Sequence, residues 1–211
     1  MIQRGGTNEA RLYLEDIPDL GIVRTDMPDM PNLIARHKAR YLLAGFFCRP
    51  GMNVLDFPCG SGYGSEVFNG AEYSGMDIDG PTIEYCKRMY GGWVTFSVGD
   101  LTKPTLMPSS YDLIACIEGF EHIGQEYQEP LIRAFYEALC PGGILIVSSP
   151  EAPWGSGPSK KNPYHKWELS QYDFADILYG SFSDVQILRH KDTLHNGEPT
   201  TCLYGICRKE N

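Results

Sequence analysis

The residues best placed to do chemistry lie in a turn where glycine occupies every second position. Residues 54–64 read VLDFPCGSGYG, so an apolar strand runs through Asp56 into Gly60, Gly62 and Gly64. Glycine permits a positive φ and lets a bound molecule approach the backbone, because it has no Cβ atom. The turn therefore predicts a site at which a nucleotide-like ligand lies against the main chain.

The spacing of these glycines differs from that of two phosphate-binding loops. Dinucleotide-binding loops follow G-x-G-x-x-G and P-loops follow G-x-x-x-x-G-K-[ST], and both place an anion at a helix N-terminus. Here the pattern is D-x-x-x-G-x-G-x-G. The carboxylate of Asp56 would repel a pyrophosphate but suits a ligand with sulfonium and ammonium groups. The spacing therefore argues against a nicotinamide-dependent oxidoreductase.

The turn resembles the S-adenosylmethionine loop of class I methyltransferases, and residues 59–65 are similar to those of a branch that modifies small molecules and glycans. The resemblance covers roughly residues 31–208. Pro58 departs from it, since most members have a small residue there and proline removes a backbone amide. Asp56 can order the turn and also lie behind the cofactor's amino group, since the two roles are compatible. The cofactor contacts implied in this segment are Asp56, Phe57, Pro58, Gly60, Gly62 and Tyr63.

Two further strands are expected to end in cofactor-binding residues. Residues 71–79 predict a strand that reaches Asp77, 21 positions after Asp56, where a carboxylate can accept both ribose hydroxyls. The resemblance adds the neighbouring Ile78. A third strand over residues 94–98 is followed by Gly99, Asp100 and Leu101. The resemblance implies that Asp100 receives the adenine amino group while the next backbone amide meets the ring.

Candidate catalytic residues follow a nearly continuous apolar run at residues 111–117. Such a run predicts a parallel strand buried on both faces, which would deliver Glu118, Glu121 and His122 to the ligand-binding edge of the sheet. His122 could take a proton from a hydroxyl acceptor, with Glu121 orienting it, although neighbours on a helix do not face each other. Alternatively, His122 packs the turn. Glu118 is either a cofactor contact or a charge at a helix N-terminus.

Two other segments are similar to parts of glycan methyltransferases. Residues 37–41, HKARY, resemble an H-x-x-R-Y segment that covers the cofactor, and Arg40 would offer its planar fork to the methionine carboxylate. If Arg40 points outward it is a solvated charge, and His37 fits an apolar helix stripe equally well. Residues 163–168, PYHKWE, resemble a P-Y-H-x-x-E segment, from which His165 could reach the acceptor; aromatic packing of a loop is the alternative. No short metal-ligand spacing such as H-E-x-x-H occurs, so no metal is expected.

The elements that must position these residues alternate between strand and helix. They predict an α/β fold with three Rossmann-like layers: a seven-stranded, mainly parallel sheet with an antiparallel terminal strand and helices on both faces. Helices are expected at residues 32–47, at 80–90, from Pro130 onward, and after a capping box at Ser170. We divide the chain into an N-terminal arm, 1–31, and a methyltransferase domain, 32–211, with a lid-like loop at 149–169.

Composition narrows the classes of partner. The formal charge of −9 leaves no basic surface for nucleic acid. No apolar run approaches the roughly 20 residues of a membrane span, and the N-terminus lacks the apolar stretch of a signal peptide, so a cytoplasmic protein without membrane partners is expected. The seven cysteines form no C-x-x-C pair and are expected to be reduced and buried.

Taken with the resemblance, these observations predict an enzyme that transfers a methyl group from S-adenosylmethionine to a small-molecule acceptor, most simply a hydroxyl of a sugar or related metabolite. Two alternatives stay open. One is an N- or C-methyltransferase that acts on an amine or a quinone-like metabolite. The other is a non-catalytic module that binds an adenosyl ligand.

Overall fold

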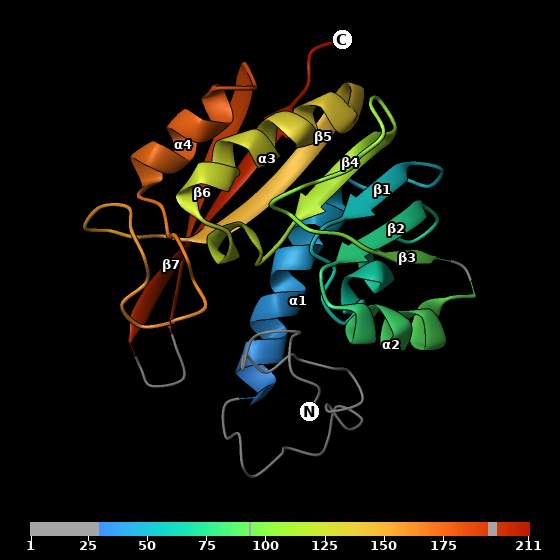
Figure 1. Cartoon of the computed structure of the whole chain (residues 1–211), viewed down its shortest axis with the longest axis horizontal. Coiled ribbons are helices and arrows are strands. Elements are labelled where there is room, and N and C mark those ends of the chain that lie inside the picture. Colours follow the sequence, from blue (N-terminus) through green and yellow to red (C-terminus); the bar gives the residue numbers. More distant parts are fainter. Residues whose placement is uncertain (1–29, 93, 194–197) are drawn as a thin grey trace.

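A computed structural model describes residues 30–92, 94–193 and 198–211 and shows helices on both faces of a twisted sheet (Figure 1). In chain order, the first elements are α1 (Met30–Phe47), β1 (Asn53–Asp56), the 3-10 helix η2 (Tyr63–Val67), β2 (Glu72–Asp77), α2 (Gly80–Tyr90) and β3 (Thr95–Val98). The remaining elements are β4 (Tyr111–Cys116), the 3-10 helix η3 (Phe120–His122), α3 (Gln125–Ala138), β5 (Leu139–Pro150), α4 (Gln171–Tyr179), β6 (Asp184–Thr193) and β7 (Pro199–Arg208).

The seven strands lie in the order β3-β2-β1-β4-β5-β7-β6. Neighbours from β3 to β5 are parallel, whereas β7 pairs antiparallel with both β5 and β6. This confirms the predicted fold class, including the terminal strand inserted in the opposite direction. Because β1 to β5 run the same way, the loops that follow their carboxyl ends lie along one edge of the sheet.

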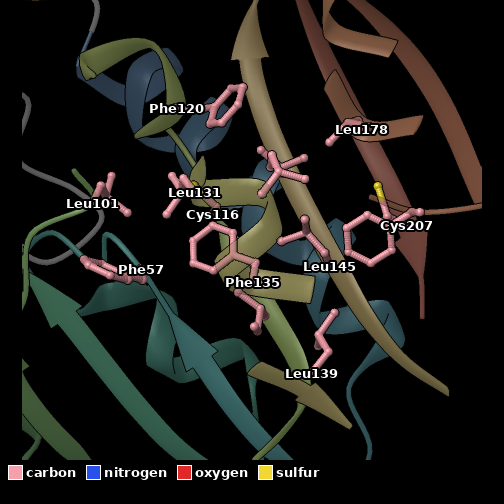
Figure 2. Packing of buried hydrophobic residues seen from close by; sticks show 14 of the residues in the cluster. Phe57, Leu101, Cys116, Phe120, Leu131, Phe135, Leu139, Leu145, Leu178 and Cys207 are labelled. Atoms are coloured by element: carbon pink, nitrogen blue, oxygen red, sulfur yellow. The ribbon is translucent and has the colours of Figure 1, made fainter. Parts of the chain in front are cut away.

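Side chains that alternate along the central strands fill two separate cores, one on each face of the sheet. Leu55 and Ile114 join the core under α3 and α4, whereas Val54 and Leu113 join the core under α1 and α2. Figure 2 shows Phe135 of α3 packed among residues of the first core. Strands buried on both faces need a continuous apolar sequence, and residues 111–117 provide it.

Short capping signals set the ends of two helices close to where the sequence predicts them. Asp79 precedes α2, and its side chain accepts the backbone N–H of Thr82. Ser170 precedes α4 and accepts the backbone N–H of Asp173, as a capping box requires. Gly180 ends α4.

The predicted start of α3 is wrong, because the helix begins at Gln125 and contains Pro130. Proline deprives one carbonyl in the first turn of its intrahelical partner. Pro130 and Glu126 are both exposed, so water can satisfy that carbonyl. Upstream, the buried side chain of Gln128 fixes the first turn by donating to the carbonyl oxygens of Phe120 and Trp167.

Strand β5 follows α3 directly and runs from Leu139 to Pro150, and residues 140–143 belong to it. Tyr111 pairs with Leu139 and Leu113 with Ile144, so an irregular register absorbs the additional residues. Gly142, at φ 74°, makes the required turn, and its N–H donates to the carbonyl of Lys209.

All seven cysteines are free and five are buried, as the sequence predicts. Among the described residues, no helix combines the length and apolarity needed to span a membrane. The N-terminal arm lies outside the described residues apart from its last two positions, and the side chain of His37 is also outside them. The domain boundary and the lid remain predictions.

Candidate functional site

The parallel strands bring the predicted site segments to one edge of the sheet. The glycine turn follows β1, Asp77 ends β2, residues 99–101 follow β3, and Glu118 to His122 follow β4. Ligands of open α/β sheets bind at this edge. Segments up to 62 positions apart, from Gly60 to His122, therefore lie along the same edge of the sheet.

The glycine turn owes its sequence partly to packing within the protein. Gly60 and Gly62 have φ of 55° and 83°, which other residues rarely adopt. A Cβ at Gly64 would lie 2.2 Å from Cε1 of Tyr41, and one at Gly62 would lie 3.0 Å from Sγ of Cys86. Two of the three glycines therefore leave room for side chains of α1 and α2. From the sequence, the lack of a Cβ atom was expected to leave room for the ligand instead.

Asp56 lies beneath this turn with both carboxyl oxygens engaged. The hydroxyl of Tyr41 donates to Oδ1 at 3.1 Å and that of Tyr73 donates to Oδ2 at 2.7 Å. Its side chain is fully buried, and this burial raises the pKa of Asp56 to about 8 against the opposing effect of the two tyrosine hydrogen bonds. The geometry matches the turn-ordering interpretation, in which Asp56 joins α1 to β2.

Asp77 connects the glycine turn to the end of β2. Its Oδ2 accepts the N–H of Gly60 at 3.1 Å, and its Oδ1 accepts the N–H of Asp79 at 3.0 Å. The carbonyl of Asp77 also accepts the N–H of Gly99, so the loop after β3 is held to it. Ile78, between these two buried acids, leaves 58% of its surface exposed. An apolar surface therefore flanks the predicted ribose carboxylate.

The remaining predicted cofactor contacts form the walls of the same edge. Asp100 Oδ1 accepts the N–H and hydroxyl of Thr102, which orders the loop after β3. Phe57 and Leu101 are buried and belong to the core under α3. The ring of Pro58 lies against Gly119, where a Cβ would be 2.3 Å from Cδ of the proline. Pro58 thus joins the loops after β1 and β4, a contact that the sequence does not predict.

Arg40 and Glu118 form an ion pair at this edge, with Nη1 2.7 Å from Oε2. Burial opposes the charge of Arg40, but Glu118, Cys202 and Tyr204 together outweigh it, so the pKa of Arg40 lies above its ordinary value. Tyr204 of β7 also hydrogen-bonds to Arg40. Glu118 has φ 55°, and its N–H donates to Oγ of Ser148. Tyr63, also predicted to contact the cofactor, has its pKa raised by burial and then by the charge of Glu118.

The three predicted catalytic residues meet although 43 positions separate His122 from His165. One polar atom from each of Glu121, His122 and His165 lies within 4.8 Å of the others. The two imidazole rings are edge to face, with centroids 5.0 Å apart. Neighbours on a helix do not face each other, but Glu121 and His122 belong to a three-residue 3-10 turn, and both lie near His165 of the loop after β5.

Backbone and side-chain partners orient the two histidines. Nδ1 of His122 lies 3.1 Å from the carbonyl oxygen of Tyr164, and Nδ1 of His165 lies 2.6 Å from Oε1 of Glu168. Burial opposes protonation of His165, but Glu168 and then Glu121 outweigh it, so the pKa of His165 is raised. Burial, followed by the charge of Glu118, raises the pKa of Glu121 to about 8.

Gln128 attaches the loop after β5 to the turn after β4, and sequence reasoning missed it. Its amide nitrogen donates to the carbonyls of Phe120 and Trp167 at 3.1 Å each. The N–H of Trp167 in turn donates to the carbonyl of Glu121. Gln128 precedes the predicted helix start at Pro130, and a single glutamine in a connecting segment gives no signal by itself. The predicted lid is therefore anchored to the site along residues 164–168.

These residues fit the cofactor that the sequence resemblance implies. Asp77 and Asp100 offer carboxylates at the ends of adjacent strands, with exposed Ile78 beside them. Val98, the last residue of β3, is also largely exposed. Carboxylates for hydroxyl and amino groups beside apolar side chains for a ring are what an adenosyl group requires.

Comparison with known proteins agrees with this geometry. A family model described as "Methyltransferase domain" matches residues 55–147. A probable S-adenosylmethionine-dependent methyltransferase of Mycolicibacterium smegmatis is 28% identical over 157 residues, which cover 72% of this chain and 59% of that protein. The ubiquinone biosynthesis O-methyltransferase of Xanthomonas campestris is 33% identical over 111 residues, covering 47% of this chain and 44% of the relative.

A solved structure shows the same fold. Phosphoethanolamine N-methyltransferase 2 of Haemonchus contortus, in complex with phosphomonomethylethanolamine and S-adenosylhomocysteine, superposes with a TM-score of 0.69 at 16% identity, covering 84% of this chain and 53% of that one. The chain spans about half the length of the curated relatives that it matches. Family match, strand order and site geometry agree with the cofactor expected from the sequence. Residues 55–147 match the methyltransferase domain family, and the chain is similar to S-adenosylmethionine-dependent methyltransferases and shares their fold.

Proposed function

We propose that this protein transfers a methyl group from S-adenosylmethionine to a hydroxyl oxygen of a small molecule. The observation that carries the proposal is the cluster of Glu121, His122 and His165 at the carboxyl end of β4. An alcohol is a poor nucleophile until its proton is shared with another group, and imidazole is the side chain best suited to accept it near neutral pH.

The chain's own residues act mainly by binding and orientation. Asp77, Asp100 and the glycine turn would hold the adenosyl group, and Arg40 would lie near the methionine carboxylate. When bound, the cofactor supplies a methyl carbon activated by its sulfonium. Holding the reacting groups in line can lower the barrier by roughly 7–11 kcal/mol, and a general base adds a factor of roughly 10²–10⁴.

The hydrogen bonds of the two histidines suggest different roles for them. Because the Tyr164 carbonyl can only accept, Nδ1 of His122 carries its hydrogen, so Nε2 of the neutral ring has the lone pair that a base needs. His165 donates to Glu168 from the lid side. We therefore assign His122 as the base and His165 as a contact to the acceptor, with Glu121 orienting the pair.

Support for the kind of acceptor comes from two directions. The segments around Arg40 and His165 resemble glycan methyltransferases, which favours a sugar hydroxyl. The relative from Xanthomonas campestris is named for ubiquinone biosynthesis, in which case the hydroxyl would be phenolic. Either acceptor would react through a hydroxyl oxygen, so each needs a histidine to take its proton.

The test is isotopic methyl transfer from S-adenosylmethionine to a panel of nucleotide sugars, free sugars, catechols and amines. We expect label on a hydroxyl oxygen. Label found only on nitrogen or carbon would contradict the proposal. Binding of the cofactor with no transfer to any member of the panel would favour the non-catalytic alternative.

Histidine variants then test the roles. His122→Gln should lower kcat by a factor of roughly 10²–10⁴ without weakening S-adenosylhomocysteine binding. His165→Gln should act mainly on the acceptor KM. The matched control is His190→Gln, an exposed position on β6. If His165→Gln abolishes turnover while His122→Gln remains active, the base belongs to the lid.

A further inference from the structure

We propose that Glu121, His122 and His165 form a binding site for a divalent first-row transition-metal ion, and that this ion binds the acceptor oxygen. The second half rests on the proposed function, whereas metal binding itself does not. Sequence spacing predicted no metal, because two of the ligands follow β4 and the third lies in the loop after β5. The fold alone assembles this ligand set.

The distances suit a metal site that closes around its ion. One potential ligand atom from each residue lies within 4.8 Å of the others. Bonds of roughly 2.0–2.2 Å to a transition metal place neighbouring ligands roughly 3–3.5 Å apart. Small side-chain rotations of two half-buried histidines can supply the difference.

Both histidines are oriented as metal ligands usually are. Imidazole ligands commonly donate one ring N–H to a carbonyl or carboxylate, which leaves the other nitrogen to bind the ion. Nδ1 of His122 meets the carbonyl of Tyr164, and Nδ1 of His165 meets Glu168. This arrangement directs metal binding to Nε2 of each ring.

The third ligand is a carboxyl oxygen that needs a partner. Glu121 is 1% exposed, and its Oε2 has no hydrogen-bond partner within the described part of the chain. A buried carboxylate oxygen in this state is costly. The nearby Glu118 adds negative charge. A cation would neutralise Glu121 and use the unpaired oxygen at the same time.

The ligand types select the kind of ion. Two imidazoles and one carboxylate suit Zn²⁺, Mn²⁺, Fe²⁺ or Co²⁺ better than Mg²⁺ or Ca²⁺, which prefer oxygen ligands. Three protein ligands also leave a coordination position open, as catalytic metal sites do. An acceptor hydroxyl can occupy it.

The chemical consequence is a more acidic hydroxyl. The ion lowers the pKa of the bound hydroxyl, whose proton leaves to solvent. An oxygen lone pair then forms the bond to the methyl carbon, while the carbon–sulfur bond breaks and leaves its electron pair on a neutral thioether. In the metal-bound protein His122 is thus a ligand, and proton loss no longer requires it to act as the base.

Cobalt binding tests the site without depending on turnover. Co²⁺ is titrated into the untagged, chelator-treated protein, and the visible absorption of the protein-bound ion is followed. We expect one equivalent to bind, to be displaced by Zn²⁺, and to raise the melting temperature. Glu168→Gln should weaken binding by roughly 10–100-fold through His165, and Glu121→Gln by at least as much.

His190→Gln is the control and should bind Co²⁺ as the unmodified chain does. Absence of a one-to-one complex, or equal binding by Glu121→Gln, Glu168→Gln and the control, would overturn the site. Circular dichroism checks that each variant is folded. If Glu121→Gln does not fold, the test of the site depends on Glu168→Gln. Once an acceptor is known, unchanged methyl transfer after chelation would overturn the ion's role in catalysis while leaving the binding site in place. Lack of transfer with or without metal would instead count against the proposed function.

Discussion

Replacing Asp56 by asparagine should flatten the dependence of stability on pH. The ordinary pKa of this carboxyl is 3.8, and burial raises it to about 8 in the folded protein. Between these values the unfolded chain releases the proton while the folded chain keeps it. Because the folded state then binds more protons, its stability falls as the pH rises. The full contribution of Asp56 is present below its ordinary pKa and is lost by about pH 8.

The magnitude follows from the width of that window. Each pH unit inside it changes the free energy of unfolding by about 1.4 kcal/mol for one proton. From pH 5 to pH 7, the unmodified protein should therefore lose about 2.7 kcal/mol through Asp56. Asparagine cannot titrate, so the stability of Asp56→Asn relative to the unmodified protein should rise by about 2.7 kcal/mol from pH 5 to pH 7. The altered hydrogen bonds to Tyr41 and Tyr73 add only an offset that is the same at each pH.

Urea denaturation followed by circular dichroism at pH 5, 6 and 7 measures the difference. Glu121 titrates with the same sign, but its contribution cancels when the variant and the unmodified chain are compared. Asp176→Asn, at an exposed position on α4, is the control and should keep the slope of the unmodified chain. Parallel stability curves for Asp56→Asn and the unmodified chain would refute the idea that Asp56 is held protonated beneath the turn.

Three other substitutions test the site's construction. Gly64→Ala places a methyl group against the buried ring of Tyr41 and should reduce the free energy of unfolding by roughly 1–3 kcal/mol; unchanged stability in urea would mean that the ring can move aside. Gln128→Ala removes two donors to buried carbonyls and should speed limited proteolysis within residues 159–168, so an unaltered cleavage rate would argue against the anchor. Asp77→Asn should weaken S-adenosylhomocysteine binding by at least about tenfold in a folded protein, because the predicted ribose acceptor loses its charge; retained affinity would remove Asp77 from the site.

Local signals in the sequence were sufficient for much of the fold. The apolar run at 111–117 predicted a central strand, Ser170 predicted the start of α4, and the alternation of strands and helices predicted the parallel sheet. These features depend on neighbours in the chain. The predicted start of α3 was wrong because it also depended on local sequence alone. Pro130 favours a helix start locally, whereas Gln128 fixes an earlier turn through hydrogen bonds to distant carbonyls.

The location of the candidate site residues at one edge of the sheet was predictable, and their arrangement relative to one another was not. Parallel strands place every acid after a strand at one edge, so Asp77, Asp100 and Glu118 were located by topology alone. The pairing of Arg40 with Glu118 and the meeting of His122 with His165 depend on how α1 and the loop after β5 fold over that edge. Sequence spacing carries no record of such contacts, so it could not predict that these side chains lie together.

The most direct test is calorimetric titration of the protein with S-adenosylmethionine, S-adenosylhomocysteine and NAD. We expect both adenosyl ligands to bind with one-to-one stoichiometry and NAD to give no heat of binding, because the alternating glycines, Asp77 at the end of β2 and Asp100 after β3 suit an adenosyl amino acid and not a pyrophosphate. Binding of NAD with no response to either adenosyl ligand would contradict the assignment of this edge as a methyl-donor site.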